Sequence, residues 1–435
     1  MSNQTQWSSE PTPKSPRFWE PFFGNAIALS IASAALLLSG CTEKASTQAA
    51  TFPETKAECA ATAVPNSFVV HWKDGTVSVE RGLTREDFER DVFEKHKDDI
   101  RFAEQDQTIK LSPMSLSPDF VSAAGSVADV GSSAAPEDTW GQTITGAQEA
   151  WNVGVRGAGV KVAIIDSGVD ITHPQLRSRI YVNTQEIGGN GIDDDQNGYV
   201  DDVSGWDFDA DQPIVGDSAG HGTHVAGIVA ADHINGTVRG IAPEAQIIPL
   251  DFMDSSGQGN LGDAILAIQY AADQGARIIN ASWGGAPCSQ SLNRAITDLE
   301  ARGILFIAAA GNSGVDLDQL PEYPAAFTIP SQITVGASTA RDFTAGFSNY
   351  SFKLVHLFAP GAQILSTYPG ARSASLSGTS MAAPFVAGAA ALVLSANPGA
   401  SAAQVRSALF NSVDRGGFAA KTQGRLNISR ALSSF

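Results

Sequence analysis

The sequence predicts an α/β fold in which helices cover both faces of a parallel β-sheet, preceded by a small α+β module. From Trp140 onward, segments that are apolar throughout alternate with Ala-rich segments of helical spacing. The apolar segments lack the polar alternation of a half-exposed strand, and this is what burial on both faces of a parallel sheet requires.

The expected elements of this region, residues 139–435, follow one another along the chain. The expected strands are VKVAIID, QIIPLDFM, RIINASWG and ILFIAAAG. Helices are expected from about His221, from about Leu261 to Gln274, from about Ser291 to Ala301, and over FVAGAAALVL.

Residues 66–110 predict the α+β module. SFVVHW alternates like a strand, Asp74-Gly75 marks a turn, and TVSVE is expected to pair with the first strand. The segment from Thr84 to Lys97 carries apolar residues at helical spacing. Residues 42–65 and 111–138 are rich in small and polar residues, so we expect a tether before the module and an accessible linker after it.

The N-terminal segment, residues 1–41, predicts export. The apolar run from Ala26 to Leu38 is shorter than the roughly 18 residues that a membrane-spanning helix needs, which is typical of a signal peptide. The following Ser39-Gly40-Cys41 completes a sequence that resembles the lipobox of bacterial lipoproteins. The resemblance implies a lipidated Cys41 and, since Thr42 is not Asp, an outer-membrane lipoprotein. The alternative is a buried Ala/Leu helix with a chance cysteine.

Composition excludes two kinds of function. The chain carries 28 Lys and Arg against 46 Asp and Glu, a formal net charge of −18, so no basic surface for nucleic acid is expected. Cys41, Cys59 and Cys288 match no zinc pattern and are too few for a disulfide scaffold. Whether Cys59 and Cys288 pair with each other stays open.

Three segments of the expected sheet domain each present one reactive side chain. Asp166 ends the strand of VAIIDSG, His221 opens the helix of GHGTHVAG, and Ser380 precedes the helix FVAGAAALVL. Because reactive groups gather at the carboxyl ends of strands and at helix starts, we expect the three to converge. A Ser hydroxyl becomes a good nucleophile when a His takes its proton and an Asp fixes the tautomer of that His.

A fourth segment, ILFIAAAGN, ends in Asn312. Its side-chain amide can donate a hydrogen bond to an oxyanion that forms at a scissile carbonyl. The backbone N–H of Ser380 is the expected second donor.

These four segments resemble the subtilisin-like serine peptidases, the subtilases. The resemblance covers about Trp140 to Leu432 and rests on AIIDSGVDITHPQL, GHGTHVAGIVAA, NASWGG, AAAGN and GTSMAAP in family order. It implies a serine endopeptidase in which Asp166, His221 and Ser380 form the triad and Asn312 completes the oxyanion hole.

Three positions stand apart from these motif roles. Phe385 takes a place where the family commonly has His, and we expect a change of packing there and no loss of activity. His173 and His224 have no triad role in the family, so we expect both to make structural hydrogen bonds.

The resemblance also implies how a substrate is bound. One extended segment carries Gly259 and Leu261, a second carries Ser282, Trp283 and Gly284, and both are expected to pair with the substrate backbone. Ala310 and Gly311 are expected to line the pocket for the side chain before the scissile bond. Because Ser313 brings no carboxylate to attract Lys or Arg, we expect broad specificity with a preference for apolar side chains.

Every charged side chain from Glu186 to Asp217 is acidic, which predicts neutralisation by a cation. The candidate ligands follow a D-x-D-x-N-G-x-x-D spacing, close to the calcium loop of an EF-hand but without its terminal Glu: Asp193, Asp195, Asn197, the Tyr199 carbonyl and Asp201. Some subtilases carry a very similar insertion, and the resemblance implies a structural Ca²⁺. The alternative is a solvated acidic loop.

Residues 66–110 resemble the inhibitory pro-domain of subtilases, whose last strand lies across the active site. The resemblance implies intramolecular inhibition until cleavage between Leu111 and Asp138. We therefore predict an exported, lipid-anchored, calcium-stabilised serine endopeptidase that acts on polypeptides. The alternatives are a catalytically silent or narrow-specificity surface binding protein, and a structural lipoprotein, which explains only residues 1–63.

Overall fold

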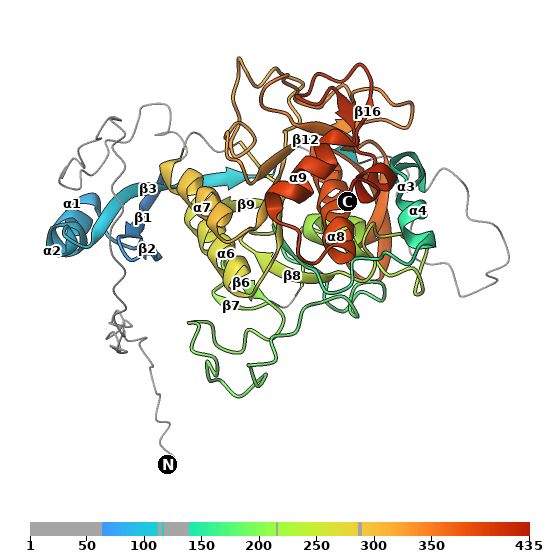
Figure 1. Cartoon of the computed structure of the whole chain (residues 1–435). Coiled ribbons are helices and arrows are strands. Elements are labelled where there is room, and N and C mark those ends of the chain that lie inside the picture. The colour runs from blue at the N-terminus through green and yellow to red at the C-terminus, as the bar shows by residue number, and fades with distance from the viewer. Residues whose placement is uncertain (1–62, 112–114, 117–138, 215, 286–288) are drawn as a thin grey trace, which may run out of the picture. The chain divides into compact units, whose positions relative to one another are not determined.

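The computed structural model describes residues 63–111, 115–116, 139–214, 216–285 and 289–435 (Figure 1). The predicted signal segment, Cys41, Cys59, Cys288 and most of the predicted tether and linker lie outside the described residues. The chain divides into the compact units Met1–Gln48 and Ala49–Phe435, and every statement below concerns the second.

A ten-stranded sheet forms the centre of the large domain, in the order β16-β17-β13-β12-β11-β10-β5-β8-β6-β7. In that order the strands are Asp414–Arg415, Gly424–Arg425, Leu357–Pro360, Gln332–Ser338, Leu305–Ala309, Ile278–Ala281, Lys161–Asp166, Gln246–Asp251, Trp206–Asp207 and Gln212–Pro213. All neighbours from β17 to β6 are parallel, and the two outer pairs are antiparallel. The predicted parallel α/β fold is confirmed.

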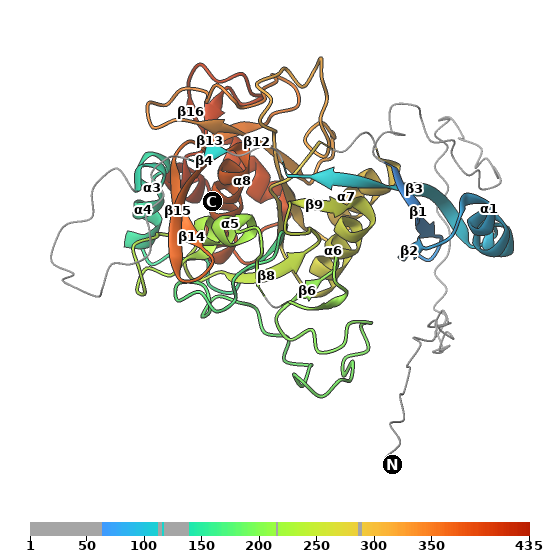
Figure 2. The same ribbon diagram turned by 180° about the vertical axis from the view of Figure 1, so that it is seen from behind.

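Alternate residues of each central strand pack into two separate cores. Val162 and Ile164 of β5 belong to the core beneath α5 and α8, whereas Ala163 and Ile165 belong to the core beneath α6 and α7. Figures 1 and 2 show these helices on the two sides of the strands. The helices are α5 (His221–Ala230), α6 (Leu261–Asp273), α7 (Gln290–Ala301) and α8 (Thr379–Ala396). The fully apolar strands therefore have the double burial that the sequence predicts.

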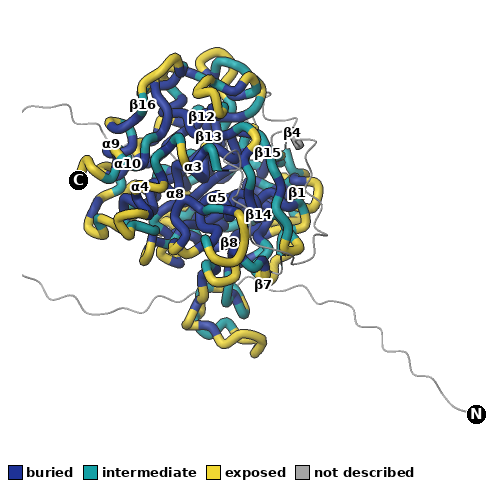
Figure 3. The backbone as a smooth tube through the Cα atoms, turned by 90° about the vertical axis from the view of Figure 1, so that its right-hand side faces the viewer, coloured by how far each residue is buried: buried dark blue, intermediate teal, exposed yellow. Residues whose placement is uncertain are grey.

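Helix α8 is the most apolar helix among the described residues. It is long and apolar enough to cross a membrane by length and composition alone, yet most of it is buried inside the domain. Figure 3 shows α5 and α8 as buried segments surrounded by exposed loops. Smaller helices complete this side of the domain: α3 (Trp140–Thr145), α4 (Ala147–Asn152), α9 (Ala402–Asn411) and α10 (Ile428–Leu432).

The upstream module consists of a small antiparallel sheet and one helical segment. Its strands are β1 (Ala63–Trp72), β2 (Val77–Arg81) and β3 (Ile100–Lys110), in the antiparallel order β2-β1-β3. The predicted helix is present as α1 (Arg85–Phe88), a π-helical turn η2 (Glu89–Phe93) and α2 (Glu94–His96). Phe68 stacks on Phe88 with ring centroids 4.3 Å apart, and this pair joins the strands to the helix.

Short strands connect the module to the large domain. Strand β9 (Gln258–Asn260) pairs antiparallel with the end of β3. A three-stranded sheet is formed by β14 (Ile364–Tyr368), β15 (Arg372–Ser377) and β4 (Ser115–Leu116), which comes from the predicted linker. The end of β3 and strand β4 therefore pair with two different strands of the large domain.

Candidate active site

Asp166 and His221 form a buried pair at the carboxyl end of the central sheet. Asp166 is the last residue of β5 and His221 is the first residue of α5. His221 Nδ1 lies 2.6 Å from Asp166 Oδ1, and neither side chain is exposed. Helix α5 comes this close because Gly222 has no side chain, since a Cβ there would collide with the Gly168 carbonyl. The predicted convergence of these two residues is thus present in the structure.

The surroundings of His221 favour its protonated form. Burial alone would lower the pKa of His221, but the Asp166 carboxylate, with a smaller contribution from Asp217, reverses the direction and holds that pKa above its usual value. His221 Nε2 is buried and has no hydrogen-bond partner among the described residues. With Nδ1 held by Asp166, Nε2 is the nitrogen that can accept a proton.

Ser380 lies within the first turn of α8, not before the helix as predicted. Helix α8 begins at Thr379, so the backbone N–H of Ser380 is one of the N-terminal amides that have no intrahelical acceptor. Ser380 Oγ donates to the Ser282 carbonyl at 2.9 Å. Pro384 cannot donate to the Ser380 carbonyl four residues back, and Ser282 Oγ donates to that carbonyl instead, at 2.9 Å. The reciprocal contacts fix Ser380 against the end of β10.

Asn312 is oriented by the residue beside Ser380. The Thr379 N–H and the Thr379 hydroxyl both donate to Asn312 Oδ1, at 2.8 and 2.9 Å. The side-chain oxygen of Asn312 is thereby used as an acceptor, which assigns the donor role to its Nδ2. The sequence did not predict this contribution of Thr379, although its place next to Ser380 could have suggested it.

Asp217 is a further residue that sequence reasoning missed. Its carboxylate accepts from the Gly220 N–H at 2.7 Å, the Thr223 N–H at 2.8 Å and the Thr223 hydroxyl at 2.7 Å. These contacts satisfy the first amides of α5 and hold the helix that carries His221. The signal was an Asp just ahead of the expected helix start, which is a common capping pattern.

The carboxyl group of Asp251 also lies in this buried acidic region. Asp251 ends β8 beside Asp166, and burial, together with repulsion from Asp207, Asp217 and Asp166, raises the pKa of Asp251 to about 8. At neutral pH this carboxyl is largely protonated, so it adds little negative charge beside the Asp166–His221 pair.

The two extended segments predicted for substrate binding flank the end of β3. Ile109 of β3 pairs with Gly259, and Lys110 forms an antiparallel bridge with Gly284. Leu261 is outside the extended segment, because it begins α6 and is fully buried. The Trp283 side chain is also in the core, where Nε1 donates to the Ile165 carbonyl at 2.8 Å. Only the backbone of Trp283 is therefore placed to pair with another chain.

A carboxylate lies where the sequence predicted none. Ala310 is buried, and Gly311 has φ = +100°, a conformation that favours glycine. Glu322 Oε2 occupies the space that a Cβ at Gly311 would fill, and Ser313 Oγ donates to Glu322 Oε1 at 2.8 Å. The sequence expectation considered only Ser313, whereas the structure places the Glu322 carboxylate beside Gly311.

A model of the subtilase family matches residues 157–430. The chain belongs to the subtilase family. Thermitase of Thermoactinomyces vulgaris is 38% identical over 291 residues, which cover 66% of this chain and 92% of thermitase. Subtilisin Savinase of Lederbergia lenta is 37% identical over 273 residues, 63% of this chain and 90% of that protein. As a member of this family, this chain is a serine endopeptidase.

Solved structures agree with this fold. A cold-adapted subtilisin-like serine proteinase is 31% identical with a TM-score of 0.52, and covers 63% of this chain and 90% of its own. Fervidolysin from Fervidobacterium pennivorans aligns over 88% of this chain and 63% of its own, with a TM-score of 0.67. At 23% identity, fervidolysin supports the fold alone.

The acidic loop of this subtilase brings two of the predicted ligands, Asp193 and Asp195, together with Glu186, which was not predicted. Oxygens of Glu186, Asp193 and Asp195 all lie within 4.8 Å of one another. Asp201 is not part of this group, and its carboxylate accepts from the backbone N–H groups of Asn190 and Gly191. Glu186 lies too far from the motif for the spacing to reveal it.

Asn197 and Tyr199 make contacts within the loop. Asn197 donates from Nδ2 to Asp195 and Asp202, and its Oδ1 accepts from the Tyr199 N–H. The Tyr199 ring packs edge-on against Trp206. These contacts fold the loop around the three carboxylates.

The three positions that stood apart from the motif roles pack within the subtilase domain. His224 Nε2 lies 3.1 and 3.0 Å from the Ile364 and Ala374 carbonyls, and burial lowers the pKa of His224 to about 3. His173 Nε2 lies 3.0 Å from the Arg372 carbonyl. Phe385 is fully buried, with its ring against Gly141. Both histidines make structural hydrogen bonds as predicted, and Phe385 is part of the core.

Proposed function

We propose that Ser380 is the nucleophile, His221 the general base and Asp166 the residue that orients and stabilises His221. The observation that carries this assignment is the buried 2.6 Å contact between His221 Nδ1 and Asp166 Oδ1, which leaves Nε2 as the proton acceptor. Attack requires Ser380 Oγ to exchange its hydrogen bond with the Ser282 carbonyl for one with His221 Nε2.

The reaction follows from these groups. Ser380 Oγ attacks the scissile carbonyl while its proton moves to His221 Nε2, and the carbonyl oxygen takes up negative charge between Asn312 Nδ2 and the Ser380 N–H. When the C–N bond breaks, His221 gives the proton to the leaving amine, and an acyl group stays on Ser380. Water then reverses the steps and releases the new carboxyl end.

We extend the proposal to the side chain before the scissile bond. Ala310 and Gly311 give the expected pocket an apolar wall, and the Glu322 carboxylate, which makes no ion pair among the described residues, adds a negative charge beside Gly311. The long aliphatic stem and terminal cation of Lys or Arg suit such a pocket better than a purely apolar side chain does. This proposal replaces the apolar preference expected from Ser313.

We expect Glu322→Gln to lower kcat/KM for a peptide with Lys before the scissile bond about tenfold or more, because one partly solvated charge attraction is lost. A matched peptide with Phe at that position should be cleaved about as well as by the parent. Glu300→Gln, an exposed site on α7, is the control and should change neither peptide. An unchanged Lys-to-Phe ratio in Glu322→Gln would remove Glu322 from the pocket.

The upstream module is proposed to inhibit the peptidase until it is cut. Two contacts support this role. Lys110 at the end of β3 pairs with Gln258 on one side and with Gly284 on the other, so the strand lies between the segments expected to hold a substrate. Leu111 continues the pairing, since its N–H donates to the Gly257 carbonyl at 2.8 Å.

Acidic side chains of the module also cap two helices of the large domain. The Asp106 carboxylate accepts from the Gly262 N–H, at the start of α6, at 2.8 Å. Glu104 accepts from the Ser289 hydroxyl and from the backbone N–H groups of Gln290 and Ser291, at the start of α7. These carboxylates satisfy helix amides that otherwise have no partner, and they tie the module to the peptidase.

We expect Glu104→Ala to shorten the lag before the full chain begins to hydrolyse a chromogenic peptide, because the module is held by fewer charge-assisted hydrogen bonds. The lag should fall about tenfold or more, because the loss of even one such bond has about that effect and Glu104 accepts three. Glu94→Ala removes the same charge from the module's exposed helix. Glu94 pairs with Lys97 of the module itself, so this variant should keep the parental lag. Equal lags in the two variants would contradict inhibition by docking.

We also propose that the acidic loop binds a structural Ca²⁺ through Glu186, Asp193 and Asp195. Oxygens bound to one Ca²⁺ at about 2.4 Å can lie at most about 4.8 Å apart, and the three carboxylates meet this limit. Glu186 is buried. The stretch from Glu186 to Asp217 contains no Lys or Arg that could neutralise its acidic side chains. A bound cation would relieve this repulsion.

In the Ser380→Ala background, a chelator should lower the Tm by about 5 °C or more, because bound Ca²⁺ stabilises only the folded loop. Asp195→Asn should abolish most of this chelator effect. Asp201→Asn should keep it, since that carboxylate binds the Asn190 and Gly191 N–H groups and is not among the three clustered carboxylates. If Asp201→Asn loses the effect and Asp195→Asn keeps it, the ligand set is wrong.

Export as a lipoprotein is proposed from the sequence alone. The support is the short apolar run that ends in Leu38-Ser39-Gly40-Cys41. Mass spectrometry of the exported protein should find an acylated Cys41 as its first residue, and an unmodified terminus elsewhere would contradict the anchor.

A further inference from the structure

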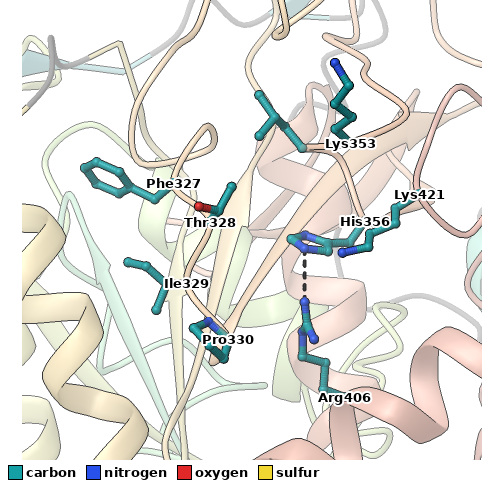
Figure 4. A pocket seen from close by; sticks show the side chains of 9 residues that line it. Phe327, Thr328, Ile329, Pro330, Lys353, His356, Arg406 and Lys421 are labelled. Carbon is teal, nitrogen blue, oxygen red and sulfur yellow. Dashed lines mark hydrogen bonds between the residues drawn. The ribbon is translucent and has the colours of Figure 1, made fainter. Parts of the chain in front are cut away.

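A cavity of about 260 Å³ lies beside β13, away from the residues of the candidate active site. It is lined by Phe327, Thr328, Ile329, Pro330, Lys353, Leu354, His356, Arg406 and Lys421 (Figure 4). Three of these side chains are cationic and none is acidic. In a chain with a net charge of −18, such a concentration of positive charge is unexpected.

The Thr334 N–H fixes which ring nitrogen of His356 carries the proton. His356 is 5% exposed, and its Nδ1 accepts from the Thr334 N–H of β12 at 2.9 Å. A neutral imidazole carries one proton, so with Nδ1 as acceptor the proton is on Nε2. Burial and the nearby Arg406 and Lys421 lower the pKa of His356 to about 3, which keeps the ring neutral.

His356 Nε2 then faces another donor. Arg406 Nη2 lies 3.2 Å from it, and a guanidinium has N–H donors and no acceptor. Arg406 Nε is buried without a hydrogen-bond partner, and neither Arg406 nor Lys421 makes an ion pair among the described residues. Figure 4 shows the Arg406 guanidinium and the Lys421 amine both directed at the His356 ring. Two donors that meet without an acceptor repel each other, and an oxygen between them would satisfy both.

We propose that this cavity is a binding site for a small oxyanion, a phosphate or a carboxylate, held by His356 Nε2–H, the Arg406 guanidinium and the Lys421 ammonium. The volume suffices for either group. Arg406 is held in place by stacking on Phe410, with its guanidinium carbon 4.5 Å from the ring centroid. Lys353 is 80% exposed and paired with Asp318 at 3.2 Å, so it is not among the groups proposed to hold the anion.

The test measures binding of inorganic phosphate and of acetate to the full chain carrying Ser380→Ala, by isothermal titration calorimetry at constant ionic strength. We expect saturable binding of at least one of the two anions, and the stronger of the two identifies the chemical source. Lys421→Met and Arg406→Met should each weaken that binding about tenfold or more. Arg341→Met removes an exposed Arg elsewhere and should leave it unchanged.

Two results would overturn the proposal. One is the absence of saturable heat for both anions with the parent. The other is an equal dissociation constant for Lys421→Met, Arg406→Met and Arg341→Met, which would reduce any effect to non-specific salt binding. If Arg406→Met does not fold, judged by near-ultraviolet circular dichroism, the comparison of Lys421→Met with Arg341→Met decides. Because every sample lacks the Ser380 hydroxyl, the outcome is independent of peptidase activity.

Discussion

Ser380→Ala is expected to lower kcat for peptide hydrolysis by a factor of about 10⁶, the magnitude known for the corresponding loss in subtilisin. The substitution removes the attacking oxygen but leaves the Ser380 carbonyl, which accepts from Ser282, in place. KM should change little, because the segments at Gly259 and Gly284 are untouched. Steady-state kinetics with a chromogenic peptide measures both constants.

The same variant should also stay intact. The described residues on either side of 112–114 pair with the large domain: Leu111 with Gly257, and Ser115 with Ser377 of β15, three residues before Ser380. We therefore expect the parent chain to cut itself between Leu111 and Ser115, a narrower interval than the sequence predicted. Intact mass over time gives the new terminus.

Ser395→Ala is the matched control, since it removes a hydroxyl from the far end of the same helix. It should cleave itself and hydrolyse peptide like the parent. If Ser380→Ala still hydrolyses peptide, Ser380 is not the nucleophile. If neither the parent nor Ser395→Ala is active, the result supports a binding function and contradicts catalysis by this triad.

Asn312→Leu should lower kcat by about 10²–10³, a range taken from subtilisin, with little change in KM. The amide acts on the oxyanion, which exists only after attack, so its loss affects the transition state more than the bound substrate. Asn293→Leu on α7 is the control for the same change of residue type away from the active site. A loss confined to KM would assign Asn312 to substrate binding.

Much of the fold and the catalytic constellation could be predicted because both depend on local patterns. Strand β5 is apolar throughout and ends at Asp166, and the glycine-rich segment before α5 marks the place of His221. The convergence of the two required only the rule that strand ends and helix starts meet at one edge of the sheet. The start of α8 was set too late: the helix was expected over FVAGAAALVL, but it begins at Thr379 and contains Pro384.

Other features could not be predicted because they depend on contacts between distant segments. Glu322 reaches Gly311 and Ser313 only after the intervening loop has folded. Glu186 joins Asp193 and Asp195 by the path of the loop, and no fixed spacing records that path. A motif fixes which residue types are neighbours in sequence, whereas charge at a pocket wall depends on the whole fold.

The two pairings on either side of residues 112–114 have a topological consequence for where the enzyme acts. A cut between Leu111 and Ser115 divides the chain so that the proposed lipid-bearing Cys41 and the module stay on one fragment, while the peptidase domain is on the other. The fragments are then joined only by non-covalent contacts, and their association depends on concentration. Under the proposed inhibition and anchoring, dilution away from the membrane would both activate the enzyme and free it to diffuse, so that one hydrolysed bond would turn a surface-bound precursor into a mobile protease.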